Sequence, residues 1–210
     1  HVDAALKELE WIENSGQFCG IGLPTLLAQQ PYLSDSSLDP VWSFLNERAM
    51  VVNMHPTGCG VNSPWLLRHK LEWVNGAPVE DATATLELLK ADIPRRFPHI
   101  TFHVAHLGGD LPMLAQRIED NYEDWDAFPA SPNESLRKFF FDAANFHEPW
   151  LALAAETFGV SQLMGGSDFP YFQEEKYVRA FDYVRTSRFT DEEKKEILWS
   201  NAARLLKLSL

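Results

Sequence analysis

Residues 100–125 read ITFHVAHLGGDLPMLAQRIEDNYEDW, and this stretch predicts a strand, a turn and a helix in succession. Its first part, 100–106, has the apolar and β-branched character of a buried strand. Gly108 and Gly109 follow as turn residues, and 111–125 carry the apolar spacing of a helix. A strand followed directly by a helix is the unit from which parallel sheets are built, so this stretch predicts an α/β fold.

The same unit recurs along the chain. A helix over 2–15, ending at Gly16, comes first, and further strands are predicted at 18–23, 49–55, 139–143 and 162–167. The remaining helices are predicted at 41–48, 81–97, 150–158, 175–186 and 191–208. Pro94 predicts a kink or a restart inside 81–97, and Thr190 with Glu193 predicts a capping box. Five strands with helical crossovers imply a parallel sheet.

Two architectures fit five parallel strands. One is an open, doubly wound sheet of flavodoxin type, and the other is part of an eight-stranded (β/α) barrel. The periodicity does not separate them. No linker or low-complexity tract divides the chain, so a single domain over 1–210 is expected. The longest irregular stretch, 56–80, follows a strand, and a loop of that length at such a place is usually functional.

Composition narrows the classes of partner. The formal net charge of -12 argues against nucleic acid, whose phosphates would repel this surface. The sequence has no long unbroken apolar run, so no membrane-spanning helix is predicted. Cys19 and Cys59 make no disulfide framework, so a cytoplasmic location is expected.

Three predicted strands end on residues that could bind a metal or a proton. His55 and His106 each close a strand, and Asp168 follows the last one. Parallel folds gather their sites at the carboxyl ends of strands, and two imidazoles with a carboxylate suit zinc or manganese. Each residue also has a structural interpretation, a hydrogen-bonded core histidine or a turn aspartate, so the prediction rests on the three together. Strand alternation places His103 on the opposite face from His106, packed against helices.

Several motifs in this order resemble the amidohydrolase-related family, nearest to its aminocarboxymuconate-semialdehyde and methylsalicylate decarboxylase type. The motifs are VVNMHP (51–56), ITFHVAHLGG (100–109), PMLAQRIED (112–120), FFFDAA (139–144), LMGGSDFPY (163–171) and ILWSNAARLLKL (197–208). Each is short, but their order and spacing make the set specific. The resemblance implies a metal-dependent (β/α) barrel.

The resemblance also implies roles for the residues at the strand ends. His55 would be a metal ligand, His106 the catalytic histidine, and Asp168 both a metal ligand and a proton relay. The cofactor would be Zn²⁺, with Mn²⁺ as the alternative. The leading function is the non-oxidative decarboxylation of an aromatic or muconate-type carboxylic acid.

Three further residues match the family near its substrate. Trp73 and Phe169 would line the pocket, although either could be ordinary core. Arg117 matches an arginine near the substrate or a subunit contact, and its alternative is an exposed helical arginine. The expected partners are a small carboxylic acid and further copies of the chain, as a homodimer or homotetramer.

One departure from the family pattern bears on activity. The family begins with a strand that carries His-x-His or Glu-x-His, and no such pair occurs here. Counted back from strand eight, the chain corresponds to strands four to eight of a partial barrel, without strands one to three. Two alternatives therefore stay open: a metal-dependent hydrolase or hydratase, and an inactive truncated form that serves as a binding or subunit module.

Overall fold

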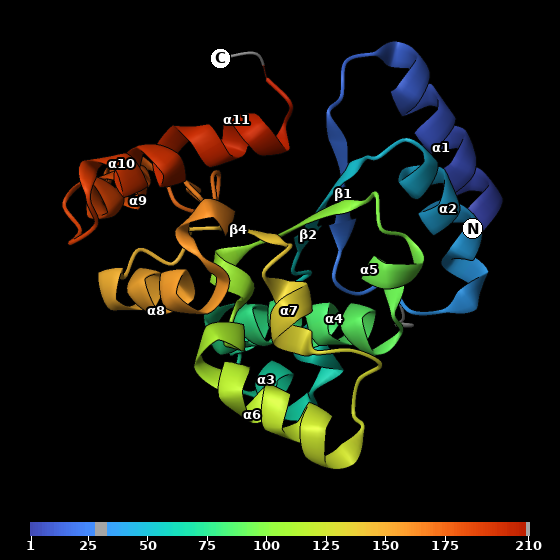
Figure 1. Ribbon diagram of the computed structural model, residues 1–210, viewed down its shortest axis with the longest axis horizontal. Helices are drawn as coiled ribbons and strands as arrows, with labels where there is room; N and C mark the ends of the chain where they lie inside the picture. Colours follow the sequence, from blue (N-terminus) through green and yellow to red (C-terminus); the bar gives the residue numbers. More distant parts are fainter. Residues whose placement is uncertain (28–32, 209–210) are drawn as a thin grey trace.

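The computed structural model describes residues 1–27 and 33–208, and it has an α/β fold built on a parallel sheet (Figure 1). The strands are β1 (Gly20–Pro24), β2 (Val51–His55), β3 (Thr101–Val104), β4 (Phe140–Asp142) and β5 (Leu163–Met164). Neighbours in the sheet are also neighbours in sequence, from β1 to β5. A doubly wound sheet reverses its strand order at a switch point, so the observed order excludes the flavodoxin type.

Helices cover one face of this sheet, called here the outer face. They are α1 (Val2–Ser15), α2 (Asp39–Glu47), α4 (Ala77–Lys90), α6 (Leu111–Trp125) and α8 (Glu148–Phe158). Alternate strand residues pack against them in the main core, among them Val52, Met54, Phe102, Val104 and Phe141. Each fully buried side chain of this size contributes about 1.5–3 kcal/mol, so this layer fixes the sheet on its helices.

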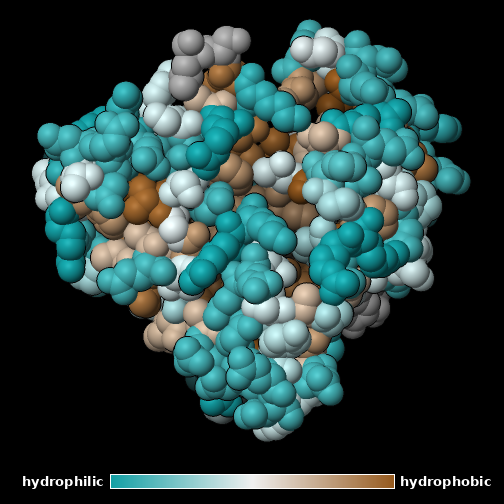
Figure 2. Space-filling model, viewed as in Figure 1, coloured by the Kyte–Doolittle hydropathy of each residue, from teal (hydrophilic) through white to brown (hydrophobic). Residues whose placement is uncertain are grey.

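The opposite, inner face carries a smaller apolar cluster near the start of the strands. Val51, Phe140 and Met164 pack there with Leu205. Leu205 belongs to α11 (Asn201–Leu205), which follows α9 (Glu174–Arg185), α10 (Asp191–Lys195) and a π-helical turn, η6 (Glu196–Ser200). Figure 2 shows hydrophobic residues gathered in a hollow at the centre of one face of the molecule. The carboxyl ends of the strands are left for polar residues.

Most predicted elements are present with shifted ends, and α6 has the predicted bounds. The stretch 56–80 is more helical than expected, with η2 (Gly60–Asn62), α3 (Pro64–Arg68) and the π-helical η3 (Glu72–Gly76). The predicted restart at Pro94 is confirmed, because α4 ends at Lys90 and α5 spans Ile93–Arg96. The capping box at Thr190 is also present, but the predicted helix 191–208 is interrupted by η6. Other short helices were also not predicted: η1 (Ser36–Leu38), η4 (His106–Gly108), α7 (Pro132–Leu136) and η5 (Val160–Gln162).

The prediction for His103 is wrong. His103 pairs in register with Asn53, which shares the inner face with Val51, so His103 faces inward and not toward the helices. The alternation fails because β3 ends at Val104 and His106 has a left-handed backbone, with φ of 54°. The side chains of His103 and His106 therefore both lie on the inner side of the sheet.

Candidate metal centre and active site

His55, His106 and Asp168 come together at the carboxyl end of the sheet, as the sequence predicted. The Nε2 atoms of both histidines lie 3.7 Å from Oδ1 of Asp168. The two imidazole rings are 5.3 Å apart between centroids. One ligand atom from each residue lies within 4.8 Å of the other two. Three residues from distant parts of the chain thus converge on one point.

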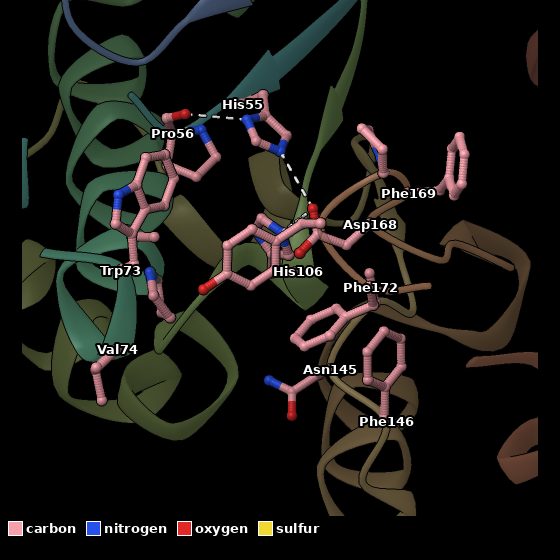
Figure 3. Close-up of a pocket in the computed structure, with 15 residues that line it drawn as sticks. His55, Pro56, Trp73, Val74, His106, Asn145, Phe146, Asp168, Phe169 and Phe172 are labelled. Carbon is pink, nitrogen blue, oxygen red and sulfur yellow. Dashed lines mark hydrogen bonds and ion pairs between the residues drawn. The ribbon is translucent and has the colours of Figure 1, made fainter. Parts of the chain in front are cut away.

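The second ring nitrogen of each histidine is already engaged. Nδ1 of His55 lies 3.0 Å from the carbonyl oxygen of Pro56 (Figure 3). Nδ1 of His106 lies 2.8 Å from Oδ2 of Asp81. A carbonyl oxygen only accepts hydrogen bonds, so Nδ1 of His55 must donate. The same holds for His106 when Asp81 is ionised. Both rings then present Nε2 to Asp168, which is how histidines are held when they bind metals.

The donor set fits a divalent metal ion. Two imidazole nitrogens and a carboxylate oxygen suit zinc or manganese. Bond lengths of about 2.0–2.2 Å place tetrahedral donors roughly 3.4 Å apart, which is close to the 3.7 Å from Asp168 to each histidine. His55 is half exposed, whereas His106 and Asp168 are mostly buried, so the point of convergence opens to solvent on the His55 side.

Mutual attraction controls the protonation of these groups. Burial alone would raise the pKa of Asp168, but the facing His106 and His55 rings lower it to about 2. Burial alone would lower the pKa of His106, but the carboxylates of Asp168 and Asp81 raise it to about 10. The pKa of His55 is also raised, chiefly by Asp168. Binding of a divalent cation among them would therefore release protons.

Asp142, at the end of β4, holds the backbone on which His106 sits. Its Oδ1 accepts hydrogen bonds from the backbone N–H of His106 (3.1 Å) and of Ala144 (3.0 Å). Its Oδ2 lies 3.1 Å from Nε2 of His103. Burial would raise the pKa of Asp142, but His103 and the other donors outweigh burial and lower it. An ionised Asp142 thus stabilises the left-handed turn that begins at His106.

Glu80, in the first turn of α4, holds the loop that follows His55. Its carboxylate accepts hydrogen bonds from Thr25 Oγ1 (3.0 Å), Thr57 Oγ1 (2.9 Å), the Thr57 N–H (2.7 Å) and the Gly60 N–H (2.6 Å). These bonds outweigh the effect of burial and lower the pKa of Glu80. Because Thr57 is two residues beyond His55, this network fixes the strand end that presents His55.

A cavity of about 490 Å³ lies beside the three converging residues. Trp73 and Phe169, predicted as pocket residues, both line it. The other aromatic wall residues were not singled out from the sequence: Phe146, Tyr171 and Phe172. The Phe146 and Phe172 rings meet edge to face with centroids 5.0 Å apart, and Tyr171 lies 6.2 Å from Trp73. Figure 3 shows Asp168 and His106 on one side of this space and the aromatic rings around it.

The structure does not bring Arg117 to the cavity. Arg117 is exposed on α6 and is not among the residues that line the cavity. A role at a subunit contact stays a prediction. The roles of Asp81, Asp142 and Glu80 were missed. Each lies on one element of the fold and contacts a residue that follows another, and the sequence does not show such contacts. The sequence signals were the FFFDAA motif around Asp142 and the resemblance of the loop that contains Glu80 to the family.

The family follows from a match that spans nearly the whole chain. The family model described as amidohydrolase matches residues 1–208. The chain belongs to the amidohydrolase family. Its metal-binding geometry at the carboxyl ends of parallel strands is consistent with that membership.

Relatives of this amidohydrolase are named as decarboxylases. The chain is 26% identical over 209 residues to 6-methylsalicylic acid decarboxylase of Penicillium expansum, covering 92% of this chain and 61% of that protein. It is 26% identical over 181 residues to 2-amino-3-carboxymuconate-6-semialdehyde decarboxylase of Dictyostelium discoideum, covering 84% and 50%. The chain thus spans about half to three fifths of the length of these relatives.

A solved structure supports the fold. The chain superimposes with a TM-score of 0.82 and 20% identity on a dihydroxybenzoic acid decarboxylase of Polaromonas sp., which was solved with bound manganese and the inhibitor 2-nitroresorcinol. The match covers 98% of this chain and 65% of that chain. At this identity the comparison establishes the shared fold. No helix in the described parts of the chain has the length and apolarity needed to cross a membrane.

Proposed function

We propose that this amidohydrolase is a metal-dependent, non-oxidative decarboxylase of aromatic carboxylic acids. The observation that carries the proposal is the convergence of His55, His106 and Asp168 on one point beside an aromatic cavity. The decarboxylase names of the relatives point in the same direction. Muconate-type acids are a second class of planar, conjugated substrate for the same cavity.

His55 and Asp168 would hold the metal, with His106 beside it. The metal is Mn²⁺ or Zn²⁺, since the nitrogen and oxygen donors suit both. When bound, such an ion would orient the oxygens of the substrate and stabilise their negative charge. Asp168 suits this role because its low pKa keeps it ionised throughout the physiological range.

His106 would supply the proton that the reaction needs. As carbon dioxide leaves, the bond between the carboxyl and ring carbons breaks, and its electron pair stays on the ring. A proton must then reach that carbon. Nε2 of His106 faces Asp168 at the cavity, and the carboxylates of Asp168 and Asp81 favour the protonated imidazole by raising its pKa. Solvent at the open His55 side would reprotonate His106 afterwards.

The cavity walls favour a planar aromatic ring. A volume of about 490 Å³ is within the range of small-molecule sites, which run from about 300 to 1,000 Å³. Trp73, Tyr171 and Phe172 offer edge and face contacts to a ring. The substrate carboxylate would lie toward the converging residues, and the rest of the ring would lie among the aromatic side chains.

We further propose that the sheet is strands four to eight of an eight-stranded barrel and that 1–210 is one domain of this kind. Strand order that follows the sequence is what a barrel segment requires. The outer edges of β1 and β5 have no strand beside them within the described residues. Three further strands between these edges would close the barrel and add metal ligands of the His-x-His type.

The test is decarboxylation by the protein expressed from its complete coding sequence. Hydroxylated benzoic acids are incubated with the Mn²⁺-loaded and Zn²⁺-loaded protein, and carbon dioxide is measured with the loss of substrate. We expect release in a 1:1 ratio with the decarboxylated arene. The Asp168→Asn variant should lose this activity. Asp182→Asn, which changes an exposed aspartate on α9, is the matched control and should keep it.

Other outcomes identify the alternatives. Turnover of esters, lactones or amides without carbon dioxide release would replace the proposal with a metal-dependent hydrolase or hydratase. A wild-type protein that neither binds metal nor turns over any of these substrates would favour the binding or subunit module. Either result contradicts the decarboxylase proposal.

A further inference from the structure

A second buried carboxylate of α4, Asp81, faces the site. Its exposed fraction is 0%, and its Oδ2 lies 2.8 Å from Nδ1 of His106. Its other oxygen, Oδ1, is buried and has no hydrogen-bond partner among the described residues. A buried carboxylate loses its hydration, and a single contact compensates poorly for that loss. Asp81 is therefore not explained by its contribution to stability.

The adjacent residue provides the contrast. Glu80 is equally buried, yet four donors from two loops satisfy its carboxylate. Glu80 joins structural segments, whereas Asp81 contacts a functional side chain and leaves one oxygen unpaired. The two residues occupy one turn of the same helix and are equally buried. They differ in how many hydrogen-bond donors reach each carboxylate.

The Asp81 contact determines how the His106 ring is presented. His106 and Leu107 both have left-handed backbones, and Asp142 fixes only the main chain at this point. The carboxylate of Asp81 is the group that engages Nδ1 of the ring. An acceptor there keeps hydrogen on Nδ1 and directs Nε2 toward Asp168 and the cavity.

The approach of α4 to this turn depends on a glycine. A Cβ atom on Gly109 would lie 1.9 Å from the carbonyl oxygen of Pro78, in the first turn of α4. Only a residue without a side chain allows the helix to come so close. The same close approach brings Asp81, three residues after Pro78, to His106. The contact is therefore built into the packing of the helix on the turn.

We propose that Asp81 is the positioning residue of His106, holding the ring through Nδ1 so that Nε2 faces the reacting end of the cavity. Asp81 does not touch the substrate and acts through His106. The catalytic consequence rests on the proposed function. The orientation of the ring does not, because it can be observed in the resting protein.

The test compares two carboxylate-to-amide changes one residue apart, Asp81→Asn and Glu80→Gln, in the complete protein. In the metal-free protein, the Nδ1–H proton of His106 is followed by NMR with ¹⁵N-labelled histidine and assigned with a His106→Gln variant. We expect a slowly exchanging Nδ1–H in the wild type. Asp81→Asn should shift it or lose it with little change in Tm, because the charged acceptor becomes neutral. Glu80→Gln should lower Tm and leave the resonance in place.

Kinetics give the second measurement. Asp81→Asn should lower kcat by about 10²-fold or more with little change in KM, as expected when a proton donor is misdirected. A wild-type protein without a hydrogen-bonded Nδ1–H on His106 would overturn the proposal, whatever the variants do. So would an Asp81→Asn variant that keeps the resonance and loses as much Tm as Glu80→Gln. If the wild type shows no decarboxylation, the proposed function fails, while NMR and Tm still decide the role of Asp81.

Discussion

At the scale of single residues, acidic side chains organise this site more than the histidines do. Asp142 fixes the backbone of His106, and Glu80 fixes the loop after His55. Asp168 brings the two rings to one point. Each carboxylate is buried at a cost that its donors must offset, so removing donors or charge should affect both stability and geometry.

The first prediction concerns Glu80. Replacing it by glutamine places an amide N–H₂ group against the N–H donors of Thr57 and Gly60. We therefore expect the free energy of unfolding at pH 7, measured with urea, to fall by about 2–3 kcal/mol. The folded-state pKa of Glu80 lies below its usual 4.5, so its ionisation stabilises the fold above pH 4.5. That stabilisation disappears as pH falls from 4.5 through the lower, folded-state pKa. The difference between wild type and variant should therefore shrink in acid, and a constant difference would contradict the assignment.

The residues of the site that could be predicted from the sequence are those at the carboxyl ends of strands. His55, His106 and Asp168 could be found because strand ends of a parallel sheet converge. Asp81 could not, because its contact depends on how closely α4 approaches the turn after β3. His103 was assigned to the wrong face, because strand alternation was extended through the left-handed residue His106.

At the scale of elements, the turn between β3 and α6 positions the site. Residues 106–109 all have positive φ values, and α4 packs against this turn through Pro78. The sequence shows a strand, two glycines and a helix, which was enough to predict the βα unit and the bounds of α6. The short helices of 56–80 were not predictable, because runs of five residues or fewer have no clear periodicity.

The second prediction tests this turn. Gly109→Ala places a methyl group 1.9 Å from the Pro78 carbonyl oxygen at a φ of 62°, so backbone must move. We expect destabilisation on the order of 3 kcal/mol, measured by urea unfolding, together with loss of the His106 Nδ1–H resonance. Gly165→Ala is the control, since its added methyl group meets its nearest neighbour at 3.5 Å. Equal stability of the two variants would show that α4 is free to move away.

At the scale of the whole molecule, the sheet is open at both edges. β1 and β5 each have one edge without a strand beside it in the described part of the chain. Unpaired strand edges present free N–H and C=O groups and promote association. α11 packs against the inner face through Leu205.

The third prediction follows from these edges. A protein that consists of 1–210 alone should self-associate or unfold at low denaturant concentration, as judged by analytical ultracentrifugation and urea unfolding. The protein from the complete coding sequence should be monodisperse in a defined oligomeric state. A monomeric, cooperatively unfolding 1–210 would contradict the proposed partial barrel.

The fourth prediction concerns metal removal, because one ion would link distant parts of the sheet. His55 ends β2 and Asp168 follows β5, so an ion held by these two residues joins strand ends that are otherwise linked only through the sheet, with His106 beside it. A ligand present at a thousand times its Kd stabilises the folded state by about 4 kcal/mol, which corresponds to a Tm shift of roughly 10 °C for a domain of this size. Chelation of the complete protein should therefore lower Tm by about that amount, and Mn²⁺ or Zn²⁺ should restore it. The response should vanish in Asp168→Asn and persist in Asp182→Asn. A wild-type Tm unchanged by chelation after verified metal loading would mean that His55 and Asp168 do not hold the ion.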